Sequence, residues 1–125
     1  MNFIEKALVR KVLKPQLTSN RDGHCELRFA SFPLIKQHAG NQLHYLADVM
    51  AYLPGVESAE IDEITGALSV RYDNSRTDVK RILKWFDSAV ESGIKASEDV
   101  DFNSAPPDKI VAAIKKYLLP TASEY

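Results

Sequence analysis

The stretch "LPGVESAEIDEITGALSVRYD", residues 53–73, carries the most regular pattern in the chain. Apolar and polar side chains alternate on both sides of a short segment that contains Gly66. The apolar positions in phase are Ala59 and Ile61 before this segment, and Leu68, Val70 and Tyr72 after it. A period of two is typical of strands that bury one face, so we predict a β-hairpin formed by residues 56–63 and 67–73.

A helical pattern flanks the predicted hairpin on each side. Residues 41–53 repeat apolar side chains every three or four positions and end at Pro54 and Gly55. Residues 77–90 repeat them in the same way, with Ser75 or Thr77 as a cap, and Gly93 follows. We therefore predict one helix before the hairpin and one after it, each with a single buried face.

Residues 24–32, "HCELRFASF", alternate as well, with Cys25 in phase with two apolar neighbours. They predict a half-buried strand, in which Cys25 is a small core residue and neither a metal ligand nor a nucleophile. Residues 94–96 predict a short last strand. Residues 18–23 predict a turn or linker, and residues 33–40 predict a loop.

The predicted elements follow the order strand, helix, strand, strand, helix, strand. This βαββαβ order predicts an α+β fold of the ferredoxin-like type, with two helices on one face of a four-stranded antiparallel sheet. The open face would be either solvated or partly covered by the terminal helices, and it would carry His24, Glu26, Arg28, Glu60 and Arg71. We assign residues 24–97 to this domain, 1–23 to an N-terminal helix and linker, and 98–125 to a linker and C-terminal helix.

Two further amphipathic helices are predicted, over residues 3–13 and 107–120. Burial of each apolar stripe outweighs what a short helix gains from propensity, so both stripes should dock, on the same chain or across a two-fold axis. Three alternatives stay open for the N-terminal helix: packing on the domain, contact with a partner, and contact with an anionic membrane surface, which is the least favoured. We expect a protein partner or a second copy, and a homodimer is favoured.

The overall composition bounds the class of protein. A net charge of -1 over 125 residues provides no basic field for nucleic-acid binding. The single cysteine excludes an internal disulfide and fits a reducing compartment. Residues 1–14 are too charged for a secretory signal, and no stretch approaches the roughly 18 consecutive apolar residues of a membrane span. We therefore expect a cytoplasmic protein.

Residues 43–73, "LHYLADVMAYLPGVESAEIDEITGALSVRYD", resemble the heavy-metal-associated (HMA-like) domains of metal chaperones and metal-pumping ATPases. The positions that carry the resemblance are Leu53, Pro54, Gly55 and Val56, with Gly66, Val70, Tyr72 and Asp73. In the metal-carrying members a C-x-x-C pair holds a soft ion, and the resemblance places that slot near Ala39 and Gln42. The chain thus resembles a cysteine-free branch of the family, and metal transport or homeostasis is the setting that the resemblance implies.

His38, His44 and His24 remain as candidates for a metal site. His38 lies by the vacant slot, His44 lies on another helical face, and His24 could approach from the first strand. These residues leave open a site for Zn(II), Ni(II) or Cu(II), although a lone surface histidine is the ordinary reading of each. The chain contains no H-E-x-x-H, G-x-G-x-x-G or P-loop motif, so we expect a non-enzymatic binding or interaction module with no assigned cofactor.

Overall fold

The computed structural model describes residues 2–125, with the side chains of all of these except Asn41. Within them, four antiparallel strands form one sheet in the order β1-β2-β4-β3. The strands are β1 (Gln16–Arg21), β2 (His24–Arg28), β3 (Val56–Ile61) and β4 (Leu68–Tyr72). The helices are α1 (Phe3–Val12), α2 (Phe32–Ala39), α3 (His44–Ala51), α4 (Val79–Asp99) and α5 (Pro107–Leu118), with 3-10 turns η1 (Gly40–Gln42) and η2 (Leu119–Glu124). The predicted α+β class is confirmed.

The β3–β4 hairpin forms where the alternating stretch predicts it. Its turn is organised by Asp62, whose carboxylate accepts hydrogen bonds from the backbone N–H groups of Ile64 at 2.8 Å and Thr65 at 3.1 Å. These two bonds favour the charged form and hold the pKa of Asp62 below its usual range. Gly66 closes the turn at φ 78°, a conformation that suits glycine because it has no Cβ.

The prediction of a turn or linker over residues 18–23 is wrong. Most of this segment belongs to β1, which pairs antiparallel with β2 around a turn at Asp22 and Gly23. β1 buries none of its residues, because it lies at the edge of the sheet and its register shifts near Thr18. An edge strand without a buried face lacks the alternation that reveals strands in a sequence.

The predicted last strand at residues 94–96 is also wrong, so the chain does not follow the predicted βαββαβ order. Residues 94–96 continue α4, which runs through Gly93 for 21 residues and buries Ile94 and Ala96. The sheet edge beside β2 is occupied instead by β1. The predicted loop at residues 33–40 is mostly α2, which has Pro33 in its first turn, where proline is tolerated. The helix predicted over residues 41–53 is divided into η1 and α3.

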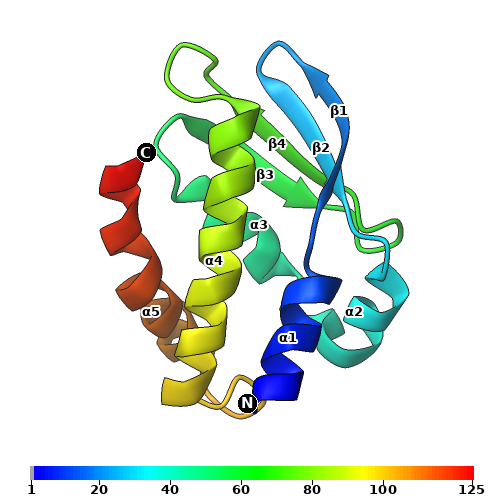
Figure 1. Ribbon diagram of the computed structural model, residues 1–125, viewed down its shortest axis with the longest axis vertical. Coiled ribbons are helices and arrows are strands. Elements are labelled where there is room, and N and C mark those ends of the chain that lie inside the picture. The colour runs from blue at the N-terminus through cyan, green and yellow to red at the C-terminus, as the bar shows by residue number, and fades with distance from the viewer. Residues whose placement is uncertain (1) are drawn as a thin grey trace.

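The core lies between the sheet and α4. Figure 1 shows α4 between α1 and α5, with the sheet behind the upper half of α4. The side chains of β2 and β4 that face this core are Cys25, Leu27, Leu68 and Val70, all fully buried. The prediction that Cys25 is a core residue is confirmed, and burial raises the pKa of its thiol to about 11. The thiol is therefore protonated and unreactive at neutral pH.

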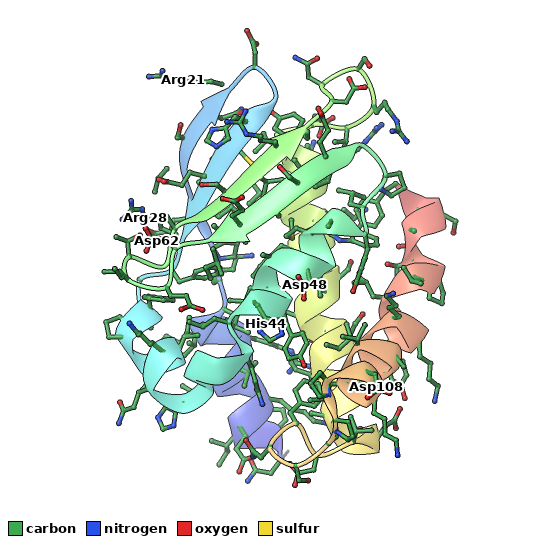
Figure 2. The ribbon with its side chains drawn as sticks, turned by 180° about the vertical axis from the view of Figure 1, so that it is seen from behind. Arg21, Arg28, His44, Asp48, Asp62 and Asp108 are labelled. Carbon is green, nitrogen blue, oxygen red and sulfur yellow. The ribbon has the colours of Figure 1, made fainter. Side chains whose placement is uncertain are left out.

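The other face of the sheet is open to solvent, as Figure 2 shows from behind the view of Figure 1. The strands present on it the polar residues that the alternation predicts: His24, Glu26, Arg28, Glu60 and Arg71. Helices α1 and α5 pack along α4 on the opposite side. Of the two alternatives for this face, solvation is therefore the one found, and the terminal helices do not cover it.

Replacing Gly66 by Ala should lower the free energy of unfolding by about 2–5 kcal/mol. A left-handed conformation costs a residue with a Cβ about 1–2 kcal/mol, and overpacking costs about 1–3 kcal/mol more. Both costs apply here, because a Cβ at Gly66 would overlap the ring of buried Phe32. Urea denaturation measures the change.

Gly40→Ala is the matched control, because the backbone of Gly40 has a right-handed conformation. A Cβ built at Gly40 would lie 4.0 Å from its nearest neighbour, Lys36 Cγ. Equal stability of the two variants would contradict the role given to Gly66.

Candidate functional site

A half-open groove with a volume of about 860 Å³ lies beneath α1. α1 forms its roof, α2 and α3 form one wall, and α4 forms its floor. Its apolar lining includes Leu8, Val12, Leu46, Val49, Phe86 and Ile94. Small-molecule sites in proteins are mostly apolar and have volumes of roughly 300–1,000 Å³, so the groove has the size and character of a binding site.

Gly93 keeps the floor of the groove open. It lies inside α4, where a glycine costs about 1 kcal/mol relative to alanine. No packing constraint explains it, because a Cβ built at Gly93 would meet no atom within 4 Å. Gly93 also lines the groove, so its missing side chain adds to the empty volume. Sequence reasoning interpreted this glycine as the end of a helix and missed its place in the site.

One end of the groove is acidic. Its described lining residues include four carboxylates, Glu5, Glu98, Asp99 and Asp101, and no lysine or arginine. A hydrogen bond from Lys6 holds the pKa of Glu98 below its usual range, and a hydrogen bond from the Tyr117 hydroxyl does the same for Asp99. Both groups are therefore charged at neutral pH. Lys6 and Lys116 balance their charges, so the negative charge that disfavours an anionic ligand at this end comes from Glu5 and Asp101.

α1 turns its basic side toward α4. Lys6 pairs with Glu98, Arg10 Nε lies 2.8 Å from Glu91 Oε1, and Lys14 Nζ lies 3.5 Å from Asp87 Oδ2. The three bases recur every four residues, which places them on one side of a helix. All three pairs are partly exposed to solvent, so they hold α1 only weakly.

The apolar stripe of α1 is largely turned away from the protein. Phe3 is 82% exposed, Ile4 76% and Leu8 54%, and no described residue of α1 is buried. α5 behaves differently and buries Ile110, Ala113, Ile114 and Leu118 beside α4. For α5, the prediction that the apolar stripe is covered is thus confirmed, and α4 of the same chain covers it. For α1 it stays a prediction, because only Val9, Val12 and Leu13 turn partly inward.

The three histidines lie on separate elements. His24 is on the open face of β2, His38 is near the end of α2 and lines the groove, and His44 begins α3, where its ring lies 4.1 Å from that of Tyr45. Figure 2 shows His44 one turn from Asp48 on α3, away from the strands. Among residues 2–125, no group of three or more His, Cys, Asp or Glu side chains is placed to hold a metal ion.

The histidine metal site stays a prediction, and titration of the purified protein with Zn(II), Ni(II) and Cu(II) tests it. Replacing Cys25 with Ser should leave any binding unchanged, because the thiol is buried and protonated. His38→Ala should weaken binding if the groove-lining imidazole is a ligand. A fall in metal stoichiometry in Cys25→Ser would show that Cys25 is a metal ligand and that its assignment as a core residue alone is wrong.

A second, polar hollow of about 430 Å³ lies on the open face of the sheet. Glu26 is already engaged there: the Thr18 hydroxyl donates to it at 2.7 Å and Arg28 Nε donates at 3.3 Å. Figure 2 shows Arg28 beside Asp62 at the same corner of the sheet. These carboxylates are partnered by neighbouring side chains and backbone, which makes the apolar groove the stronger candidate site.

Comparison of the chain with protein-family models, with curated proteins and with solved structures found no match. Within the described part of the chain, none of the helices has both the length and the apolar character that crossing a bilayer requires.

The attachment of α1 should depend on its ion pairs. The double substitution Glu91→Gln and Glu98→Gln removes two of the three acidic partners, so amide hydrogen exchange in residues 6–12 should become several-fold faster. The cooperative melting transition should hardly move, because α1 contributes no buried residue to the core.

Glu63→Gln, in the exposed β3–β4 turn, serves as the control and should leave the exchange unchanged. Wild-type protein in high salt should resemble the double variant, since salt screens exposed pairs. Unaltered exchange in both conditions would mean that contacts other than these pairs hold α1.

Proposed function

We propose that the protein is a non-enzymatic binding module that holds an elongated apolar molecule in the groove beneath α1. The observation that carries this proposal is the open floor of the groove at Gly93, in the middle of a long helix that would be more stable with alanine. A position that gives up helix stability for empty space fits a role in accommodating a ligand.

The polar groups around the groove determine which kind of ligand it favours. Gln42 Nε2 donates to the carbonyl of Phe102 at 2.6 Å, and Glu98 and Asp99 are engaged by Lys6 and Tyr117. These groups are held by neighbours, and they set the charge at one end of an apolar cleft. The favoured ligand therefore has an apolar body and a neutral or cationic head.

A second proposal concerns the fold of the part of the chain that resembles HMA-like domains. From β2 to α4 the chain forms a strand, the helices α2 and α3 with η1 between them, two strands and a helix, and β4 lies between β2 and β3 in the sheet. We propose that these elements form a divergent ferredoxin-like unit, in which β1 stands in for the last strand. Ala39 and Gln42, at the slot that the resemblance assigns to metal ligands, line the groove. An accessory role in metal transport or homeostasis remains the proposed setting and rests on the resemblance alone.

The neutral dye N-phenyl-1-naphthylamine should bind the groove in a saturable manner. Trp85 is the one tryptophan of the chain and lies next to groove-lining Phe86, so energy transfer from Trp85 reports the bound dye. Gly93→Leu fills the floor and should weaken binding at least tenfold, and Gly93→Ala, which adds one methyl group to the floor, should weaken it to a smaller extent. The anionic dye 8-anilinonaphthalene-1-sulfonate should bind more weakly than the neutral one, because of the acidic end.

Thermal melting of each variant separates a blocked groove from a disturbed fold. Gly93→Ala should melt slightly higher than the wild type, since alanine favours the helix and meets no neighbour. If Gly93→Leu is unstable, Ser97→Leu, about one turn further along the same lining, is the second blocking variant. Wild-type dye affinity in stable blocking variants would refute the proposed function.

A further inference from the structure

α1 differs from an ordinary surface helix of a globular protein, because Val9 and Val12 are the only apolar side chains of its described residues that turn partly inward. An ordinary surface helix packs its apolar stripe inward and shows its charges to water. Here the bases Lys6 and Arg10 face α4, while Phe3 and Ile4 are the most exposed apolar side chains of the helix. Leu8, one turn beyond Ile4, extends the outward stripe to the mouth of the groove.

The charged residues near this apolar stripe are mostly basic. Lys6, Arg10, Lys11 and Lys14 lie on or just beyond α1, and Glu5 is the one acid among them. Lys11 forms no ion pair with the described residues, and the side chain of Lys14 stays 70% exposed within its pair. An apolar face bordered by lysine and arginine is the pattern of helices that lie in the interface of an anionic bilayer.

We propose that the outward face of α1, formed by Phe3, Ile4, Leu8 and Lys11, docks on an anionic lipid surface. The apolar side chains enter the boundary between head groups and acyl chains, and Lys11 and Lys14 meet the lipid phosphates. This inference goes beyond the proposed function and does not depend on what the groove binds.

A second copy of the chain fits the same face less well. A two-fold axis through this face would bring Lys11 of both copies into one interface, and like charges across an interface are unfavourable. The face is also small. Stable interfaces bury roughly 800 Å² on each partner, whereas its largest side chain, Phe3, can bury roughly 150–250 Å².

Docking through this face brings Leu8, which also lines the groove, to the lipid surface. Leu8 lines the groove from α1 and Leu34 lines it from α2, and both remain exposed at its mouth. The ion pairs of Lys6 and Arg10 lie on the side of α1 that faces α4, so docking through Ile4 and Leu8 leaves them in place. A helix held in this way can bind the membrane without unfolding the core beneath it.

Flotation of the full chain with vesicles tests the proposal. The protein should float with vesicles of 70% phosphatidylcholine and 30% phosphatidylserine, and several-fold less with pure phosphatidylcholine. The double variant Phe3→Glu and Ile4→Glu should bind the mixed vesicles at least tenfold more weakly. Ile64→Glu is the matched control, because Ile64 is 84% exposed on the β3–β4 turn, and it should bind like the wild type.

Lys11→Glu keeps the apolar stripe and should also weaken binding, which guards against loss of helicity in the double variant. Both variants should retain binding of N-phenyl-1-naphthylamine if the groove works as proposed. Equal flotation of the double variant and wild type would overturn the proposal, as would absence of wild-type binding to mixed vesicles. A wild-type dimer in light scattering that the double variant converts to a monomer, without vesicle binding, would assign the face to self-association instead.

Discussion

The indole N–H of Trp85 donates a hydrogen bond to the carbonyl of Val49 at 2.8 Å, in a part of the core that is closed to water. A buried donor without a partner is costly, so this bond fixes the distance between α4 and α3. Val49 belongs to the wall of the groove and Phe86, next to Trp85, belongs to its floor. Tyr125 packs edge-on against Trp85, with ring centroids 5.2 Å apart, and its hydroxyl bonds Ser88 at 2.8 Å. The floor and wall of the groove therefore form one rigid unit.

The roof of the groove is held by a different kind of interaction. α1 meets α4 through exposed ion pairs and a few half-buried side chains, among them Val12 and Leu13. Exposed pairs stabilise little and weaken with salt, whereas the apolar core beneath depends on neither. The groove thus has a tightly packed floor and wall, and a roof that is held mainly by exposed ion pairs. This division supports a role in binding, because a ligand needs a shaped site and also a route into it.

Sequence reasoning succeeded where a buried face imposes a period, and failed where it does not. The β3–β4 hairpin and α5 were predictable because apolar side chains repeat at the spacing of the element. β1 was missed because an exposed edge strand needs no alternation, and residues 94–96 were misassigned because Gly93 looked like a helix end. Periodicity also cannot show whether a stripe faces inward or outward. The basic side of α1 contacts Glu91 and Glu98, which are distant in the sequence and close only after folding.

Pairing of β1 with β2 has a consequence for the folding pathway. Each of the two hairpins, β1–β2 and β3–β4, joins neighbouring segments, so each can form without closing a long loop. The β2–β4 pairing is then the one sheet contact that must bring distant segments together. A sheet completed by a C-terminal strand would need a second such closure, between strands still further apart in the chain. Using the N-terminal segment instead lowers the contact order, which favours faster folding and a shorter exposure of unpaired strand edges.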